Sequence, residues 1–154
     1  MIVTADADLP LAARRIIFGK LLNAGQTCVA PDYLLVERSV QEKLTGLLQQ
    51  EITHFLGQTP LDHPDYPRII NEKHLRRLEG LLTGGRIVCG GTVQNGRIAP
   101  TLMDNLDSDA PIMQEEIFGP ILPILPFDTL EEAMDYVSRR PKPLALYLFS
   151  RDKE

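Results

Sequence analysis

Cys28 stands in the stretch NAGQTCVAPDY, residues 23–33, where a helix-like segment gives way to a polar loop. Such a loop can expose a thiol and leave its backbone N–H unpaired, as a nucleophilic cysteine requires. A lone cysteine is more often a small packed side chain. Residues 24–32 contain no Lys, Arg or His, and the preceding helix would point its negative end at the loop, which disfavours a thiolate. If Cys28 is a nucleophile, we expect its activation to come from elsewhere.

Two adjacent carboxylates, Glu115 and Glu116, form the second candidate site, in MQEEIFGP at residues 113–120. Gly119 and Pro120 predict a sharp bend that keeps the Phe118 ring beside these acids. One interpretation is a solvated acidic pair before a strand. The other is a carboxylate that offers paired acceptor oxygens to a diol, with a phenyl face beside it.

Other patterns favour no further chemistry. His54, His63 and His74 lack metal-ligand spacing and the chain has no Cys-x-x-Cys, so we predict no metal site. The glycines of GGRIVCGG, residues 84–91, match neither the dinucleotide fingerprint nor the P-loop. Cys89, inside this strand-like stretch, is expected to pack.

Composition restricts the class of protein. The chain has 154 residues, of which 44% are hydrophobic and 24% charged, as expected for one globular domain. Its net charge of −5 argues against nucleic-acid binding, which needs a clustered basic surface. No apolar run approaches the roughly 20 residues of a transmembrane helix, and no secretory signal is recognisable. Two cysteines distant in sequence predict a reducing, cytoplasmic environment rather than a disulfide scaffold.

Helical and strand-like segments alternate along the chain. Residues 9–24 predict a helix that ends at Gly25, and further helices begin at a Ser39–Glu42 capping box, at Asn71, and at a Thr129–Glu132 capping box with Ala133, Met134 and Val137 inside. The strand-like segments are residues 33–37, 86–91, 97–103, 121–125 and 144–150, with a tight turn at Asn95-Gly96. This alternation predicts an α/β layered domain with a largely parallel sheet. Because the chain begins and stops in strand-like sequence, we expect a fold that is incomplete at both ends.

The two candidate sites together resemble the aldehyde dehydrogenase superfamily. GQTCVAPDY is followed, 88 positions after Cys28 (116 − 28), by the second glutamate of EEIFGP. APDY, RIIN at 68–71, IAPTL at 98–102 and KPLALYLFS at 142–150 resemble the class 3 branch, which includes fatty, aromatic and coniferyl-type aldehyde dehydrogenases. The resemblance covers essentially the whole chain. It implies a three-layer αβα catalytic domain over residues 1–154.

The resemblance implies a role for three residues. Cys28 would attack an aldehyde to give a thiohemiacetal, hydride would pass to NAD or NADP, and water would hydrolyse the resulting thioester. The backbone N–H of Cys28 would help to stabilise the oxyanion. Glu116 would hold the nicotinamide ribose hydroxyls, and Phe118 would pack near that ribose. The resemblance also implies that the full-length protein forms a homodimer.

The resemblance also implies that the family's general-base glutamate, oxyanion asparagine and NAD(P)-binding domain are to be expected upstream of these residues. We therefore expect residues 1–154 to be inactive alone. Two other hypotheses stay open: a thiol module in which Cys28 is redox-active or acylated, and a folded, non-catalytic interaction fragment. A second cysteine near Cys28 would favour the thiol module, and none is near in sequence.

Overall fold

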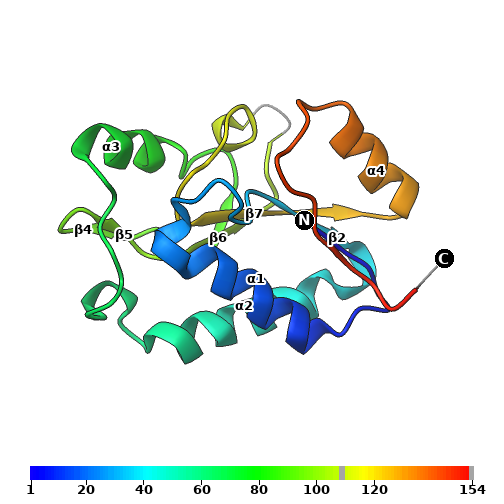
Figure 1. The fold of residues 1–154 in the computed structure, drawn as a ribbon, viewed down its shortest axis with the longest axis horizontal. Helices are drawn as coiled ribbons and strands as arrows, with labels where there is room; N and C mark the ends of the chain where they lie inside the picture. Colours follow the sequence, from blue (N-terminus) through cyan, green and yellow to red (C-terminus); the bar gives the residue numbers. More distant parts are fainter. Residues whose placement is uncertain (108–109, 153–154) are drawn as a thin grey trace.

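The computed structural model describes residues 1–107 and 110–152, which form the predicted α/β domain (Figure 1). Its main sheet has, within those residues, six strands in the order β3-β6-β7-β2-β1-β8. Every neighbouring pair is parallel except β3 and β6. The strands are β1 Ile2–Val3, β2 Leu34–Glu37, β3 Arg86–Cys89, β6 Thr101–Asp104, β7 Ile121–Phe127 and β8 Leu148–Phe149, with a separate hairpin of β4 Val93–Gln94 and β5 Arg97–Ile98. The predicted, largely parallel sheet is confirmed.

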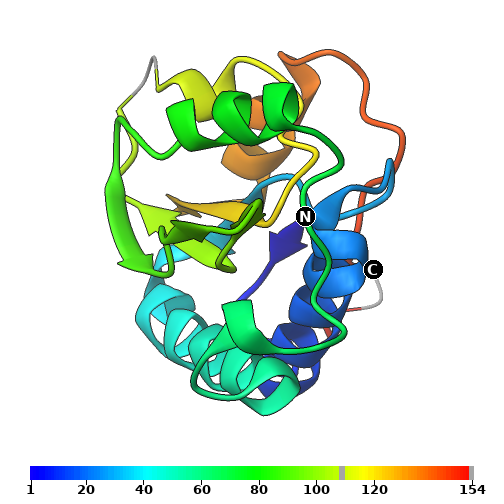
Figure 2. The same cartoon turned by 90° about the vertical axis from the view of Figure 1, so that its left-hand side faces the viewer.

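Helices cover both faces of this sheet. The views in Figures 1 and 2 place α1 and α2 on one face and α3 and α4 on the other, which gives three layers. Their bounds are α1 Leu9–Leu21, α2 Gln41–Leu56, α3 Glu72–Gly80 and α4 Leu130–Ser138. Residues 34–36 of β2 are consecutive buried apolar side chains, as expected for a parallel strand covered on both faces. No helix in the described part of the chain is both long and apolar enough to span a bilayer.

Two of the three predicted helix caps are confirmed. The side chain of Asn71 accepts a hydrogen bond from His74 N at 2.9 Å, and that of Thr129 accepts one from Glu132 N at 3.3 Å. The prediction of a cap at Ser39 is wrong. Ser39 lies inside a 3₁₀ turn, Arg38–Val40, and its hydroxyl donates to Glu37 Oε1 at 3.2 Å instead of accepting from the backbone of α2.

The helix before Cys28 ends at Leu21, earlier than predicted. Three successive residues then adopt left-handed backbone angles, with φ of 52° at Asn23, 51° at Ala24 and 71° at Gly25. Of these only glycine adopts that region without a steric cost. The conformation of the fully buried Ala24 is therefore held by its surroundings and not by its own preference.

Predictions for the last two elements were partly wrong. Met134 is exposed on α4, because Ala133 and Val137 take the positions facing the sheet. The strand expected over residues 144–150 is reduced to β8, and the Leu144 side chain is 73% exposed. β8 is the edge strand beside β1, and of its two residues Leu148 is exposed while Phe149 packs, partly buried, against the core. The Asn95-Gly96 turn was predicted correctly, but it connects β4 to β5 and not β3 to β6.

The pairing of β2 with β7 brings the two candidate sites together. Cys28 lies in the loop before β2, Glu116 lies in the loop before β7, and these neighbouring strands are parallel. Both loops therefore emerge at the same, amino-terminal edge of the sheet. The loops touch at Gly25, where a Cβ atom would lie 2.3 Å from the carbonyl oxygen of Gly119.

We expect Gly25→Ala to lower the free energy of unfolding by about 2–4 kcal/mol, because it adds a left-handed backbone penalty to a backbone clash. The matched control is Gly46→Ala in α2, where a Cβ meets nothing within 4 Å. That change should raise stability by about 0.5–1 kcal/mol, since alanine favours a helix. Chemical denaturation of the two variants checks this, and equal stability of Gly25→Ala and the parent would contradict it.

Asp6 attaches the end of β8 to the start of the chain. Its carboxylate accepts hydrogen bonds from the Thr4 hydroxyl, from Ser150 Oγ, and from the backbone N–H groups of Arg151 at 2.7 Å and Asp152 at 2.9 Å. These bonds, the Thr4 contact first, lower the pKa of Asp6 from 3.8 to about 2. An acid with a lowered folded-state pKa stabilises the fold above its unfolded pKa and loses that contribution as the pH falls.

The attachment of β8 should therefore be intact above about pH 4 and weaken as the pH falls toward about 2. Asp6→Asn should weaken it already at neutral pH, because an amide nitrogen cannot accept from N–H groups. Amide hydrogen exchange of residues 148–152 measures the effect. Exchange that is as slow in Asp6→Asn as in the parent at neutral pH would show that Asp6 does not hold this edge.

Candidate active site

Cys28 lies on a surface loop with its thiol free. The side chain is exposed, and Cys28 forms no disulfide with the other cysteine, Cys89. Among the described residues, no acceptor is hydrogen-bonded to the backbone N–H of Cys28. The sequence predicted both properties. A thiol and a free N–H on one residue can bind an electrophilic carbon and the oxygen attached to it.

The buried side chain of Gln26 fixes the start of this loop. Its Oε1 accepts from Ile70 N at 2.9 Å, while Nε2 donates to Asn23 O at 3.0 Å and to Arg68 O at 3.2 Å. All of these partners are backbone atoms, so the geometry does not depend on mobile side chains. The RIIN segment, residues 68–71, is thereby tied to the cysteine loop.

The buried side chain of Lys20 binds the end of the cysteine loop, at Pro31. Its side chain is 3% exposed, and Nζ donates to Pro31 O at 2.6 Å. Burial lowers the pKa of Lys20 from 10.5 to about 8, and the negative charge of Asp32 acts in the opposite direction. Sequence reasoning missed this residue, although Lys20 follows Ile16 by four positions and so shares the buried face of α1.

Asp32 links the cysteine loop to the loop before β7. Its Oδ1 accepts from the backbone N–H of Ile117 at 2.9 Å, and Ile117 is itself fully buried. The residue between the two predicted cofactor-binding residues, Glu116 and Phe118, is therefore bound directly to the loop of Cys28. The sequence feature from which this contact could have been predicted is the carboxylate four positions after Cys28.

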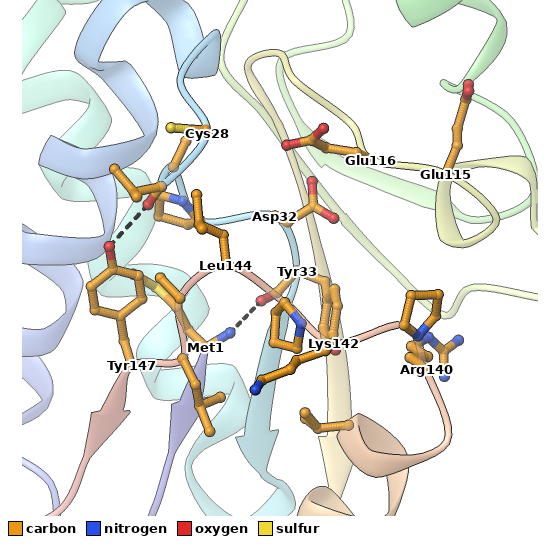
Figure 3. A pocket seen from close by; sticks show the side chains of 18 of the residues that line it. Met1, Cys28, Asp32, Tyr33, Glu115, Glu116, Arg140, Lys142, Leu144 and Tyr147 are labelled. Carbon is orange, nitrogen blue, oxygen red and sulfur yellow. Dashed lines mark hydrogen bonds between the residues drawn. The ribbon is translucent and has the colours of Figure 1, made fainter.

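Cys28 and Glu116 line one cavity of about 520 Å³ (Figure 3). Of the two adjacent acids, Glu115 is paired with Arg77 at 3.1 Å. The Glu116 carboxylate has no hydrogen-bond or ionic partner among the described residues, and Figure 3 shows it turned toward the side of the cavity where Cys28 lies. Of the two acids, Glu115 is therefore paired, and Glu116 is free to accept hydrogen bonds from a ligand.

Phe118 differs from the other two predicted residues. It has a positive φ of 48° and a partly exposed ring, and it is not among the residues that line this cavity. An aromatic residue in the left-handed region is uncommon and requires support from its neighbours. Here the neighbours are the buried residues Ile117 and Gly119.

The segment after α4 forms the opposite wall of the cavity. Tyr147 donates from its hydroxyl to Val29 O at 3.1 Å, next to Cys28. Arg140 lies over the Tyr136 ring at 3.7 Å, and both Arg140 and Lys142 line the cavity. Figure 3 shows both cations away from Cys28, toward the other end of the cavity. Over the described residues, no group of three or more His, Cys, Asp or Glu side chains converges as a metal site.

Known proteins resemble this chain in sequence and in fold. The sequence profile of the aldehyde dehydrogenase family matches residues 1–154. The 4,4'-diaponeurosporen-aldehyde dehydrogenase of Staphylococcus aureus is 51% identical over 157 residues, covering 99% of this chain and 34% of that protein. The dimeric, NADP-preferring aldehyde dehydrogenase of Bos taurus is 47% identical, covering 96% of this chain and 63% of that protein.

Among solved structures, the substrate-bound state of Staphylococcus aureus AldH superposes with a TM-score of 0.95 at 49% identity. The match covers 99% of this chain and 34% of that one. The chain thus spans about a third of the length of the two Staphylococcus aureus relatives. Given the family match over all 154 residues and the agreement in fold, this chain belongs to the aldehyde dehydrogenase family.

Proposed function

We propose that this chain is catalytic-domain material of a class 3-like aldehyde dehydrogenase, which oxidises an aldehyde to the carboxylic acid with NAD or NADP. The observation that carries the proposal is the shared cavity, which is lined by an exposed thiol and an unpaired carboxylate from two loops that are distant in sequence. Membership of the aldehyde dehydrogenase family supports the reaction class. Cys28 is the proposed nucleophile.

The chemistry at Cys28 needs both of its free groups. The thiolate sulfur forms a bond to the aldehyde carbon, and the carbonyl electron pair moves to oxygen, giving a thiohemiacetal. The unpaired backbone N–H of Cys28 is a fixed donor for that oxygen. After loss of hydride the carbon is a thioester, which water hydrolyses to release the acid and restore the thiol.

The residues present fit a nicotinamide cofactor on the side of Glu116. A ribose diol presents two hydroxyl donors, and the free Glu116 carboxylate offers two acceptor oxygens in the cavity. NAD or NADP, when bound, supplies the hydride acceptor. Phe118, next but one along the chain, is the proposed apolar contact near the ribose. The name of the Bos taurus relative, dimeric and NADP-preferring, supports NADP as a candidate and a homodimer as the assembly.

The general base of the thioester hydrolysis is proposed to lie outside these residues. Three carboxylates line the cavity, and two of them are engaged: Asp32 with Ile117 N and Glu115 with Arg77. The third, Glu116, is the proposed ribose ligand. Because the chain spans about a third of the Staphylococcus aureus relative, the base, the oxyanion asparagine and the NAD(P)-binding domain are assigned to the remaining length. A cytoplasmic location remains a prediction from the sequence.

The thiol-module hypothesis receives less support. Cys89 lies on β3, is partly buried, and is absent from the cavity that Cys28 lines. Burial raises the pKa of the Cys89 thiol, which makes it a poor partner for thiol exchange. A folded, non-catalytic fragment is the outcome that remains if the following tests of activity fail.

The test uses a full-length enzyme, for example a chimaera in which these 154 residues replace the matching segment of the Staphylococcus aureus relative. In this enzyme Cys28→Ala should abolish aldehyde oxidation. Without the sulfur no thiohemiacetal can form, whereas cofactor binding should be nearly unchanged. Aldehyde-dependent NADH formation and cofactor titration measure the two properties. Cys89→Ala serves as the control thiol variant, and the isolated 154-residue chain should form no NADH. Turnover by Cys28→Ala above about a hundredth of the parent rate would exclude Cys28 as nucleophile.

Glu116→Gln should slow hydride transfer by about 10- to 100-fold in the same enzyme, because a looser ribose no longer holds the reacting atoms in attack geometry. Single-turnover formation of NADH isolates this step from product release. Glu131→Gln, at an exposed position in the first turn of α4, is the matched control. A single-turnover rate equal to that of the parent would remove Glu116 from the cofactor site.

A further inference from the structure

Arg77 on α3 binds the loop that carries the proposed ribose ligand. Its Nη1 donates to Glu115 Oε1 at 3.1 Å and to Glu116 O at 3.2 Å, and its Nη2 donates to Ile117 O at 2.5 Å. The Arg77 side chain is 24% exposed. Its neighbour Arg76 is 74% exposed and forms an ion pair with Glu72, within α3. Two adjacent arginines on one helix thus have different surroundings.

The peptide groups of Ile117 are held from two sides. Arg77 binds the Ile117 carbonyl, and Asp32 accepts from the Ile117 N–H at 2.9 Å. Gly119 packs against Leu78, so closely that a Cβ at Gly119 would lie 2.5 Å from Leu78 Cδ2. With Ile117 held in this way, the directions of the Glu116 and Phe118 side chains on either side of it are set by the backbone.

These contacts form a closed ring with the cysteine loop. Gln26 binds Ile70 N, directly before the Asn71 cap of α3, and Arg77 on α3 binds Ile117 O. The ring returns to the cysteine loop through Asp32, which binds Ile117 N. Each of the three non-covalent links in this ring is a hydrogen bond between a side chain and the backbone. The ring therefore fixes the backbone of one loop relative to that of the other.

We propose that Arg77 is a positioning residue, which closes this ring and so sets the place of the Glu116 carboxylate relative to the Cys28 thiol. The inference rests on the proposed function for the roles of Cys28 and Glu116. Arg77 acts through the backbone of residues 116–117, and its ion pair with Glu115 is secondary. A planar guanidinium can donate to three oxygens in a fixed fork, whereas a lysine ammonium on a flexible stem cannot reproduce this geometry.

The test compares Arg77→Lys and Arg77→Gln with Arg76→Gln in the full-length enzyme described above. We expect both Arg77 variants to slow single-turnover hydride transfer by about 10- to 100-fold and to raise the deuterium isotope effect with a C1-deuterated aldehyde. The KM for the aldehyde and the rate of Cys28 alkylation should stay near the parent values. Arg76→Gln should remain within about twofold of the parent, because exposed helix ion pairs contribute little. Glu115→Gln, which keeps both backbone contacts, should retain most of the parent rate.

A second readout does not depend on turnover. Amide hydrogen exchange of residues 113–120 in the same proteins should be faster in both Arg77 variants than in the parent and in Arg76→Gln, with melting temperatures compared in parallel. If the parent enzyme forms no NADH, the proposed function fails, and the exchange data still decide whether Arg77 holds the loop. Parent-like exchange in Arg77→Lys would overturn the inference. An effect confined to cofactor affinity, with hydride transfer unchanged at saturation, would also overturn it, since Arg77 would then bind the cofactor directly.

Discussion

The contact between the cysteine loop and the loop before β7 is the constraint on which the site depends. These loops are about ninety residues apart in sequence, and they meet because β2 and β7 are adjacent and parallel. Gly25 permits the backbones to approach, and Asp32 binds Ile117 N across the junction. Without this junction the thiol and the carboxylate would belong to separate surfaces. The strained backbone at Asn23, Ala24 and Phe118 lies on either side of it, which indicates that the surroundings impose these conformations.

The site lies at an edge of the sheet that general rules would not favour. In open α/β sheets ligands commonly bind beyond the carboxyl ends of parallel strands. Here the loops that precede β2 and β7 carry Cys28 and Glu116, so the cavity lies at the amino ends. A loop that enters a strand continues directly into its buried hydrogen-bonded backbone. The position of the thiol is therefore linked to the buried strand β2.

Charged groups around the cavity differ in whether another residue engages them. Lys20 and Asp32 support the cysteine loop through backbone contacts, and Glu115 is held by Arg77. Glu116 is the carboxylate that these pairings leave free to face the cavity. A paired carboxylate has fewer free lone pairs for a ligand. Because Asp32 and Glu115 are paired, they compete less with Glu116 as hydrogen-bond acceptors in the cavity. Two identical adjacent residues, Glu115 and Glu116, thus have different surroundings.

The sequence by itself determined the alternation of helices and strands, the caps at Asn71 and Thr129, and the residue types at the candidate site, because each depends on periodicity or on groups a few positions apart. Only the tertiary structure decided which acid is free, that Lys20 is buried, and that Gln26, Asp32 and Arg77 connect the loops. It also overturned the cap at Ser39 and the burial of Met134 and of residues 144–150. The reason is physical: strand order and edge position follow from which distant segments pack together, and a local pattern carries no information about that packing.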